Sequence, residues 1–479
     1  MADISLRKRV WGWMAFDWAS QPFYTLGLTF IFGPYFASVA TTYFMGNGFE
    51  EQAADARAQS LWSLGQTLSG LVIAFVGPVL GAYADSTGRR MPWIVAFSVV
   101  YVISVSALWL MVPDGSGLWV ALFAFCIGFV VAEFALIFTN AMLPSLGADD
   151  EIGKISGGGA SLGYVGGVVS LFLMLLFFAE NETGRTLIGL SPPFGLDPEQ
   201  REGTRFVGPF SAIWFVIFMV PFFLWVREDP AQQTRPTMAE ATSGPDATFG
   251  SALHDLWISI KGILHRPSLA AYLASSMFYR DALNALYGFG GVYAVLVLDW
   301  SITMIGVFGI VGAITAAIVT YVSGLFDSHF GPKPVITVCV WVLIAVCTVI
   351  VSMSREMIFG LPLAEGSSLP DIVFYVCGAA IGGAGGGLYA ASRSMMVRHT
   401  NPERPTEAFG LFALSGKATA FLAPALIGLV TFITENPRLG VSPVIFLFLI
   451  ALILLRWVKA EGDRAAWSDT SPSLQPSSG

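Results

Sequence analysis

Long apolar stretches recur along the whole chain, and they restrict its fold more than any other feature of the sequence. Each stretch runs for roughly 18 to 28 residues without polar alternation, whereas a helix needs about 20 residues to cross a bilayer. Only α-helices and closed barrels satisfy their backbone groups in hydrocarbon, and barrel strands are alternating segments of about 10 residues. The sequence therefore predicts an all-α integral membrane protein and excludes a barrel.

The composition agrees with a surface that faces lipid. Apolar residues make up 55% of the chain and charged residues only 12%, against about 25% charged residues in soluble domains. The net charge of −8 argues against a nucleic-acid partner, which needs clustered Lys and Arg. The four cysteines lack metal-ligand spacing, and the sequence contains no phosphate-binding loop or nucleophile motif. We expect neither an enzyme nor a metal or other cofactor.

Twelve spans can be placed from gaps between charges and from Gly/Pro punctuation. They lie near 13–40, 60–84, 92–112, 118–141, 156–179, 209–226, 268–298, 302–325, 334–352, 370–392, 407–432 and 441–458. Of the 25 Lys and Arg residues, seventeen fall on the side of the N-terminus, six on the opposite side and two within spans. Because cytoplasmic loops retain Lys and Arg, both termini are predicted to be cytoplasmic, in a multi-pass protein of the cell (inner) membrane.

An internal repeat divides the chain into two halves. The pattern Gly81-x-x-x-Asp85 after the second span recurs as Ser323-x-x-x-Asp327 after the eighth, and a Pro follows each Asp by seven residues. Two related six-helix bundles are the simplest explanation, with the binding site between them near the bilayer midplane. The predicted parts are bundles at 1–226 and 268–460, a cytoplasmic linker with a surface helix at 227–267, and a disordered tail at 461–479.

The loop after the second span, Gly81-x-x-x-Asp85-x-x-Gly88-Arg89-Arg90, resembles the signature loop of the major facilitator superfamily. Its glycine lets another helix approach closely, and its Asp can accept hydrogen bonds from a helix N-terminus or pair with an adjacent Arg. The superfamily's loop latches the cytoplasmic gate, so the resemblance implies a gate role for these residues. The repeat extends that role to Asp327. Arg393, at a cytoplasmic helix end, is assigned to the gate, with anchoring to lipid phosphate as the alternative.

The opening segment is similar to the start of the vacuole-effluxer-like branch of that superfamily. It reads Trp13-Met-Ala-Phe16-Asp17-Trp18-Ala19-Ser20, and Pro34-Tyr35-Phe36 follows. Two later stretches agree: Asn140-Ala-Met-Leu-Pro144 with Ile155-Ser-Gly157, and Ala391-Ser-Arg393-Ser394 with Glu407-Ala-Phe-Gly410. The resemblance spans roughly residues 10–458. It implies the major facilitator fold and movement of a solute, with amino acids as first candidates.

Charged and polar side chains inside the spans are the candidates for substrate binding or coupling, because each charge costs about 2.5 to 3.5 kcal/mol to insert. They are Asp17, Gln21 and Tyr24 on one face of the first span, Glu133 and Asn140 in the fourth, Arg280, Asp281, Asn284 and Tyr287 in the seventh, and Lys417 in the eleventh. The alternative is structural ion pairing, for example of Arg280 with Asp281, although buried pairs often contribute little net stability.

Acidic and basic side chains together suit a zwitterionic or anionic solute, so export of an amino acid or small peptide is the leading hypothesis. A desolvated carboxyl at Glu133 or Asp281 would have a raised pKa and could carry a proton, while Na⁺ coupling stays open. The remaining alternatives are a carrier for a sugar, an organic anion or a lipid-like solute, a membrane enzyme, and a non-transporting sensor or assembly protein. The expected partners are the solute and the bilayer, and the expected state is a monomer.

Two sets of glycines concern the mechanism rather than binding. Gly159, Gly163 and Gly167 repeat at four-residue spacing in the fifth span, and glycines crowd the tenth span from Gly382 to Gly387. Small residues at this spacing indicate close helix packing. They also suit contacts that let two bundles rock against each other.

Overall fold

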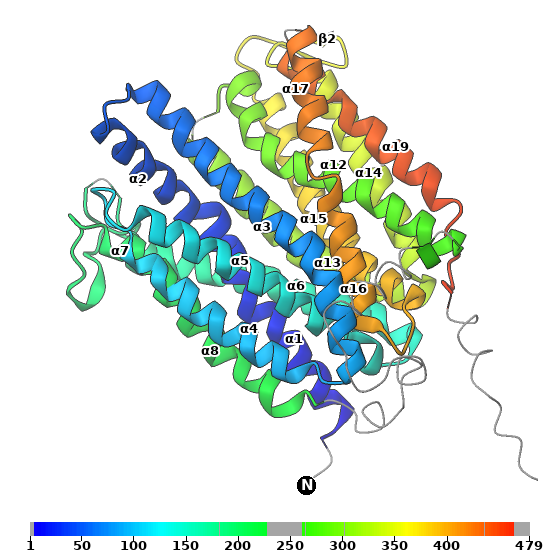
Figure 1. The fold of residues 1–479 in the computed structure, drawn as a ribbon. Coiled ribbons are helices and arrows are strands. Elements are labelled where there is room, and N and C mark those ends of the chain that lie inside the picture. The colour runs from blue at the N-terminus through cyan, green and yellow to red at the C-terminus, as the bar shows by residue number, and fades with distance from the viewer. Residues whose placement is uncertain are drawn as a thin grey trace, which may run out of the picture. The chain divides into compact units, whose positions relative to one another are not determined.

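The computed structural model describes residues 4–181, 183–227, 261–263, 265–300, 302–434 and 436–463. Its regular elements are helices, apart from an antiparallel hairpin of β1 (Met357–Ile358) and β2 (Leu361–Pro362) (Figure 1). Among the described residues, eleven helical segments are long and apolar enough to cross a membrane. The predicted all-helical membrane class is confirmed. The count of twelve spans and the cytoplasmic termini remain predictions, and most of the predicted linker and tail lies outside the described residues.

The chain forms two compact units. Unit 1 comprises Met1–Val76, Arg89–Thr139 and Gly158–Gln233, and unit 2 comprises Gly77–Gly88, Asn140–Gly157 and Thr234–Gly479. The boundaries cut through two helices, because the last part of the second span and the first part of the fifth pack with the C-terminal helices. The first of these segments carries Gly81, Asp85 and Gly88 of the predicted gate, whereas Arg89 and Arg90 belong to unit 1.

The helices of unit 1 begin with an interrupted first span. Its α1 (Leu6–Pro22) passes through the π-helix η1 (Phe23–Phe30) into α2 (Phe32–Gly46). Pro22 explains the irregularity, since its ring and missing N–H disturb the helical ladder. The elements that follow in the chain are α3 (Glu51–Thr87), α4 (Met91–Ser106), η2 (Ala107–Leu110), α5 (Leu118–Asn140), η3 (Leu143–Ser145), α6 (Asp149–Leu173), η4 (Met174–Phe178), η5 (Pro193–Gly195), α7 (Glu202–Arg205) and α8 (Val207–Trp225). Of these, η3, the end of α3 and the start of α6 belong to unit 2.

Helix α1 lies between α6 and α8, and different residues make the two contacts. Toward α8, the Trp18 ring stacks on Trp214 with the centroids 5.6 Å apart. Toward α6, a Cβ on Gly159 would lie 2.8 Å from Asp17 Oδ2, and one on Gly163 would lie 3.2 Å from the Asp17 carbonyl oxygen. The glycine series of the fifth span therefore gives close packing against the helix that carries Asp17.

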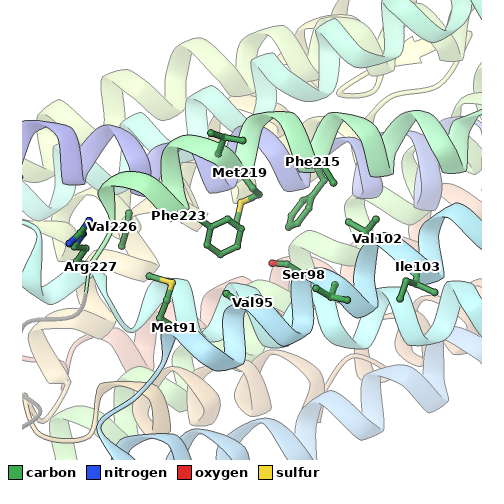
Figure 2. A pocket seen from close by; sticks show the side chains of 13 residues that line it. Met91, Val95, Ser98, Val102, Ile103, Phe215, Met219, Phe223, Val226 and Arg227 are labelled. Carbon is green, nitrogen blue, oxygen red and sulfur yellow. The ribbon is translucent and has the colours of Figure 1, made fainter.

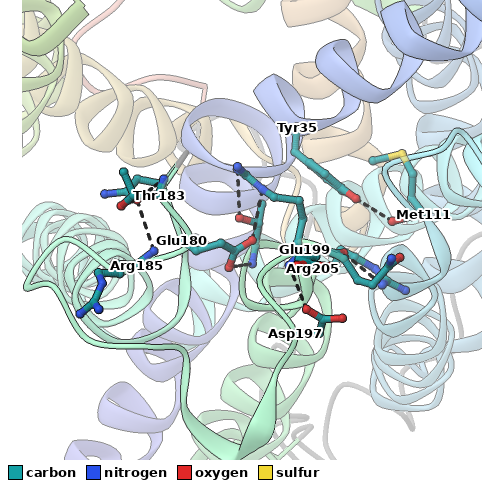
Figure 3. A network of polar contacts seen from close by, with 12 residues as sticks. Tyr35, Met111, Glu180, Thr183, Arg185, Asp197, Glu199 and Arg205 are labelled. Carbon is teal, nitrogen blue, oxygen red and sulfur yellow. Dashed lines mark hydrogen bonds and ion pairs between the residues drawn. The ribbon is translucent and has the colours of Figure 1, made fainter.

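A polar network closes one end of unit 1 (Figure 3). The Glu180 carboxylate accepts a hydrogen bond from the Thr204 N–H at 3.0 Å and lies 3.2 Å from Arg201 Nε. Arg205 donates to the Trp109 carbonyl oxygen from Nε at 3.0 Å and from Nη2 at 2.7 Å. The segment between η4 and α8 is thereby fixed to η2, and the fully buried Glu180 side chain gains a charged partner.

Unit 2 contains the helices of the second half. They are α12 (Pro267–Leu298), α13 (Ile302–Phe330), α14 (Pro332–Ser352), α15 (Leu369–His399), α16 (Pro405–Ala418), α17 (Leu422–Thr434), α18 (Pro437–Gly440) and α19 (Ser442–Leu455). The glycine-rich α15 packs along α13, because a Cβ on Gly382 would meet the Gly312 backbone and one on Gly383 would lie 2.9 Å from a Val319 methyl carbon. The second glycine set thus gives close packing as well.

Candidate functional site

In unit 1, the structure brings two of the candidate residues together. The Tyr24 hydroxyl, on the π-helical segment η1, donates to Glu133 Oε1 on α5 at 3.3 Å. Gln21 donates to Thr25 Oγ1 at 3.4 Å. Asp17 lies two turns from Tyr24, is 8% exposed and faces the glycines of α6. Tyr24 and Glu133 therefore form one polar pair, and Asp17 occupies a separate, more enclosed position.

In unit 2, the eleventh span is not the continuous helix that the sequence predicted over 407–432. Helix α16 ends at Ala418, and α17 begins at Leu422 after a turn. Pro424, near the start of α17, explains the break, because it has no N–H and its ring clashes with the carbonyl four residues earlier. Thr419 holds the turn against α12 by donating from Oγ1 to the Met277 carbonyl oxygen at 3.2 Å.

Two consecutive residues of α12 hold the two sides of this break. Arg280 Nη1 donates to the Phe412 carbonyl oxygen of α16 at 2.8 Å, and its Cζ lies 4.4 Å from the centroid of the Phe412 ring. Its guanidinium fills the space that a side chain at Gly416 would occupy. Asp281 Oδ2 accepts from the Ala423 N–H of α17 at 2.9 Å. Arg280 and Asp281 thus bind different segments, which does not support the simple pairing of the two with each other.

The second carboxylate oxygen of Asp281 has a different environment. The residue is 1% exposed, and Oδ1 has no hydrogen-bond partner among the residues that the structure describes. A buried carboxylate oxygen without a partner is costly in its charged form. Protonation, or binding of a cation or a donor group, would relieve that cost. The arrangement therefore leaves Asp281 with one oxygen that holds the helix and one without a hydrogen-bond partner among the described residues.

The remaining candidates of unit 2 do not form one cluster among the described residues. Lys417 is half-buried in the last turn of α16. Asn284 and Tyr287 are exposed on α12, and the Tyr287 hydroxyl lies over Gly385 of α15. Asn140 also belongs to unit 2, and its Oδ1 accepts from Arg393 Nη1 at 3.4 Å.

Sequence reasoning missed the hydroxyl groups that extend this stripe of α12. The Tyr279 hydroxyl lies 2.8 Å from Ser392 Oγ, and the Tyr272 hydroxyl donates to the Ser392 carbonyl oxygen at 2.6 Å. Ser276 Oγ lies 3.1 Å from Ser415 Oγ. Positions 272, 276 and 279 have helical spacing with Arg280, so the signal was present in the sequence. The signal from these hydroxyl residues was weaker than the signal from the charged residues, because Tyr and Ser are common in membrane helices.

The first copy of the repeated motif contacts the start of α16. Asp85 Oδ2 accepts from the Glu407 N–H at 2.9 Å, and Asp85 is 5% exposed. A Cβ on Gly81 would lie 2.6 Å from the Thr406 carbonyl oxygen, so only glycine permits this approach. The sequence allowed Asp85 to bind either a helix N-terminus or an adjacent Arg. The hydrogen bond from Glu407 is a contact with a helix N-terminus, where backbone N–H groups and the helix dipole favour a carboxylate.

The second copy contacts the start of α6. A Cβ on Gly153 would lie 2.5 Å from Asp327 Cγ, and the Lys154 N–H donates to Ser328 Oγ at 2.9 Å. Asp327 is 2% exposed, and among the described residues neither of its carboxylate oxygens accepts from a backbone N–H at the start of α6. Each Asp-Ser step of the repeat therefore abuts the first turns of another helix, but the hydroxyl makes the hydrogen bond in the second copy.

Arg393 joins α15 to α6 and is completely buried. Nε donates to Ser156 Oγ at 3.1 Å and Nη2 to the Ser156 carbonyl oxygen at 2.6 Å. Complete burial leaves no access to lipid, which removes phosphate anchoring as its role. Gly88 ends the α3 turn with φ +64°, and Arg89 is exposed while Arg90 is the half-buried N-cap residue of α4.

Membrane-spanning helices in two units, an interrupted helix beside buried charges and a repeated helix-end motif define a transporter of the major facilitator type. Solved structures share the fold. The proton:xylose symporter XylE superposes with a TM-score of 0.66 at 13% identity, covering 96% of this chain and 98% of that one. The Escherichia coli fucose:proton symporter FucP superposes with a TM-score of 0.66 at 12% identity, covering 94% of this chain and 98% of that one. The human organic anion transporter MFSD10 superposes with a TM-score of 0.62 at 14% identity, covering 95% of this chain and 100% of that one.

The chain belongs to the family described as vacuole effluxer Atg22 like, which matches residues 5–466. An uncharacterized MFS-type transporter of Bacillus subtilis, YxiO, is 21% identical over 94% of both chains. Autophagy-related protein 22 of Coccidioides immitis is 23% identical over 63% of this chain and 47% of its own length, so the match spans about half of that relative. The protein is a multi-pass membrane transporter and not an enzyme.

Proposed function

We propose that this transporter moves a small polar solute, with an amino acid or small peptide as the first candidate, and exports it by alternating access. The observation that carries the proposal is the break between α16 and α17, held by Arg280 and Asp281. Interrupted membrane helices expose backbone groups and helix ends, which transporters use to bind charged parts of a solute.

The charges near the break suit a zwitterion better than a neutral sugar. Lys417 lies in the last turn of α16, directly before the break, and can bind a carboxylate. Asp281, with one oxygen unengaged among the described residues, can accept from an ammonium group. A sugar carrier would need neutral donors and acceptors and would not benefit from the half-buried Lys417 and the buried Asp281, each of which is costly to insert.

We propose Asp281 as the proton-carrying residue and Glu133 as a second candidate. A proton on Asp281 Oδ1 would remove the buried charge while Oδ2 continues to accept from Ala423. Loss of that proton to an open cavity would restore the charge, so protonation and conformation become linked. Na⁺ is the competing coupling ion, because carboxylate and carbonyl oxygens also suit it.

The two motif contacts serve as latches in this proposal. Asp85 with α16 and Asp327 with α6 hold helix starts together at one end, and access at that end requires both contacts to open. The excess of Lys and Arg at this end supports a cytoplasmic location for it, in a protein of the cell (inner) membrane. Labelling of single cysteines next to these residues in intact cells would test the orientation, since a reagent that does not cross the membrane should leave them unlabelled.

Transport into proteoliposomes tests the proposed function. Labelled amino acids, dipeptides, sugars and organic acids are supplied under an imposed pH or Na⁺ gradient. We expect amino-acid or dipeptide flux driven by the pH gradient, lost in Asp281→Asn and kept in Asp299→Asn. Asp299 is a matched control, because it ends the same helix, is exposed and has φ +53°, a conformation that Asn tolerates. Flux of sugars alone, or flux indifferent to the pH gradient, would contradict the proposal.

A further inference from the structure

An apolar groove runs between α4 and α8 in unit 1 (Figure 2). Its volume is about 910 Å³. It extends along α4 from Met91 to Ile103 and along α8 from Phe215 to Arg227. At about 1.5 Å per helical residue, each side is about 18 Å long. One leaflet of hydrocarbon is about 15 Å deep, half of about 30 Å. The groove therefore matches the depth of a single leaflet.

The rims of the groove face the surroundings of the protein. Val99 is 54% exposed, Ile103 65% and Val216 51%. Helices of membrane-spanning length that expose such side chains face lipid rather than water. The floor is buried, with Phe215 and Met219 reaching toward α4 (Figure 2). Ser98, a small side chain among branched ones, leaves the hollow between the two helices.

One end of the groove is positively charged. Arg227 lies at this end with Met91, and its side chain is exposed (Figure 2). Arg89 and Arg90 immediately precede Met91 in the chain. Glu228 and Asp229 follow Arg227 in the sequence, so three positive and two negative charges leave a net charge of +1. A guanidinium binds a phosphate with two hydrogen bonds, which fits a phospholipid headgroup.

We propose that the groove between α4 and α8 binds one anionic phospholipid, with an acyl chain on the Phe215–Met219 floor and the phosphate at Arg227. Three observations carry this assignment: the groove's length, its exposed apolar rims and the cationic end. The end with Arg227 is also the one that the distribution of Lys and Arg assigns to the cytoplasm, where the leaflet is anionic. The proposal does not depend on the identity of the transported solute.

Native mass spectrometry of the delipidated full-length protein in detergent tests it. The protein is titrated with phosphatidylglycerol or phosphatidylcholine of identical acyl chains, and binding of the first lipid is measured. We expect phosphatidylglycerol to bind more tightly. Arg227→Gln should weaken phosphatidylglycerol binding about fivefold and phosphatidylcholine binding by less, because the choline ammonium offsets the charge of its phosphate. Ser98→Phe fills the hollow and should weaken both lipids. Glycerol 3-phosphate should not compete, because it lacks acyl chains.

Two matched variants separate the groove from the general surface. Arg456→Gln removes an exposed arginine after α19, and Ala96→Phe adds the same ring to an exposed position of α4 that does not line the groove. The proposal requires that Arg227→Gln weaken phosphatidylglycerol binding more than Arg456→Gln does. It also requires that Ser98→Phe weaken lipid binding more than Ala96→Phe does. Absence of either difference, or a dimer signal that Ser98→Phe abolishes, overturns the proposal. Val99→Trp replaces Ser98→Phe if that variant does not fold.

Discussion

Asp281 accepts a hydrogen bond from the backbone N–H of Ala423, 142 residues later in the chain, at 2.9 Å. Ala423 is the second residue of α17, so the carboxylate stands at a helix N-terminus, where negative charge is favoured. The preceding residue, Arg280, binds the helix on the other side of the break. One turn of α12 therefore holds both ends of an interrupted helix. Arg280 and Asp281 stabilise this arrangement, whether or not they also take part in coupling.

If Asp281 both caps α17 and carries a proton, different substitutions at this position should affect thermal stability and proton coupling separately. Asn retains an oxygen for the Ala423 N–H, so Asp281→Asn should fold with nearly unchanged thermal stability and lose the effect of a pH gradient on flux. Asp281→Ala leaves a buried N–H unpaired, which costs about 1 to 3 kcal/mol, and should also lower the unfolding temperature. Thermal unfolding in detergent and flux in liposomes measure the two effects. Equal destabilisation by Asn and Ala would contradict the assignment of Oδ2 as a helix cap.

The contact between Tyr24 and Glu133 predicts a coupling between two substitutions. Tyr24→Phe removes the hydrogen bond at 3.3 Å, and Glu133→Gln weakens it by removing the charge of the acceptor. If the pair acts as a unit, the double variant should lose about as much transport as the more damaging single variant. The measurement is the rate of solute flux at saturating and limiting solute. Additive losses would show that the two side chains act independently.

The sequence predicted which residues belong to the candidate site better than it predicted which residues they contact. Periodicity and charge placed Arg280, Asp281 and Lys417 inside spans, because insertion costs leave few such residues. The break after Ala418 was also readable in principle, since Pro424 cannot continue a helix ladder. What could not be read was that Arg280 would stack on Phe412, because that contact depends on how two helices pack.

The repeated motif shows the same limit. The repeat placed Asp85 and Asp327 at equivalent positions, and each lies against the start of another helix. The sequence does not reveal that Ser328 rather than Asp327 makes the hydrogen bond in the second copy. Small differences in approach distance decide which oxygen reaches an N–H, and a one-letter pattern does not contain them.

The close approach at Gly81 predicts a difference between two glycines of α3. A Cβ at Gly81 would lie 2.6 Å from the Thr406 carbonyl oxygen, whereas nothing lies within 4 Å of one at Gly70. Gly81→Ala should destabilise the latched conformation by about 1 to 3 kcal/mol, the usual cost of overpacking. Gly70→Ala should be neutral or slightly stabilising. Cysteine labelling beside the latch, compared between the two variants, reports how often it opens. Equal labelling in both would count against a latch at Gly81.

The burial of Arg393 predicts that even lysine cannot replace it. The guanidinium makes two hydrogen bonds to Ser156, at 3.1 Å and 2.6 Å, from separate nitrogens, and a single ammonium cannot reproduce that fork. Arg393→Lys should lose at least about 1.5 to 3 kcal/mol, the worth of one hydrogen bond to a charged group. Thermal unfolding of the purified protein measures the loss, and Arg456→Lys at an exposed position is the control. If the two variants unfold at the same temperature, the contact between α15 and α6 contributes little to the folded state, and Arg393 would have to act through the transport cycle alone.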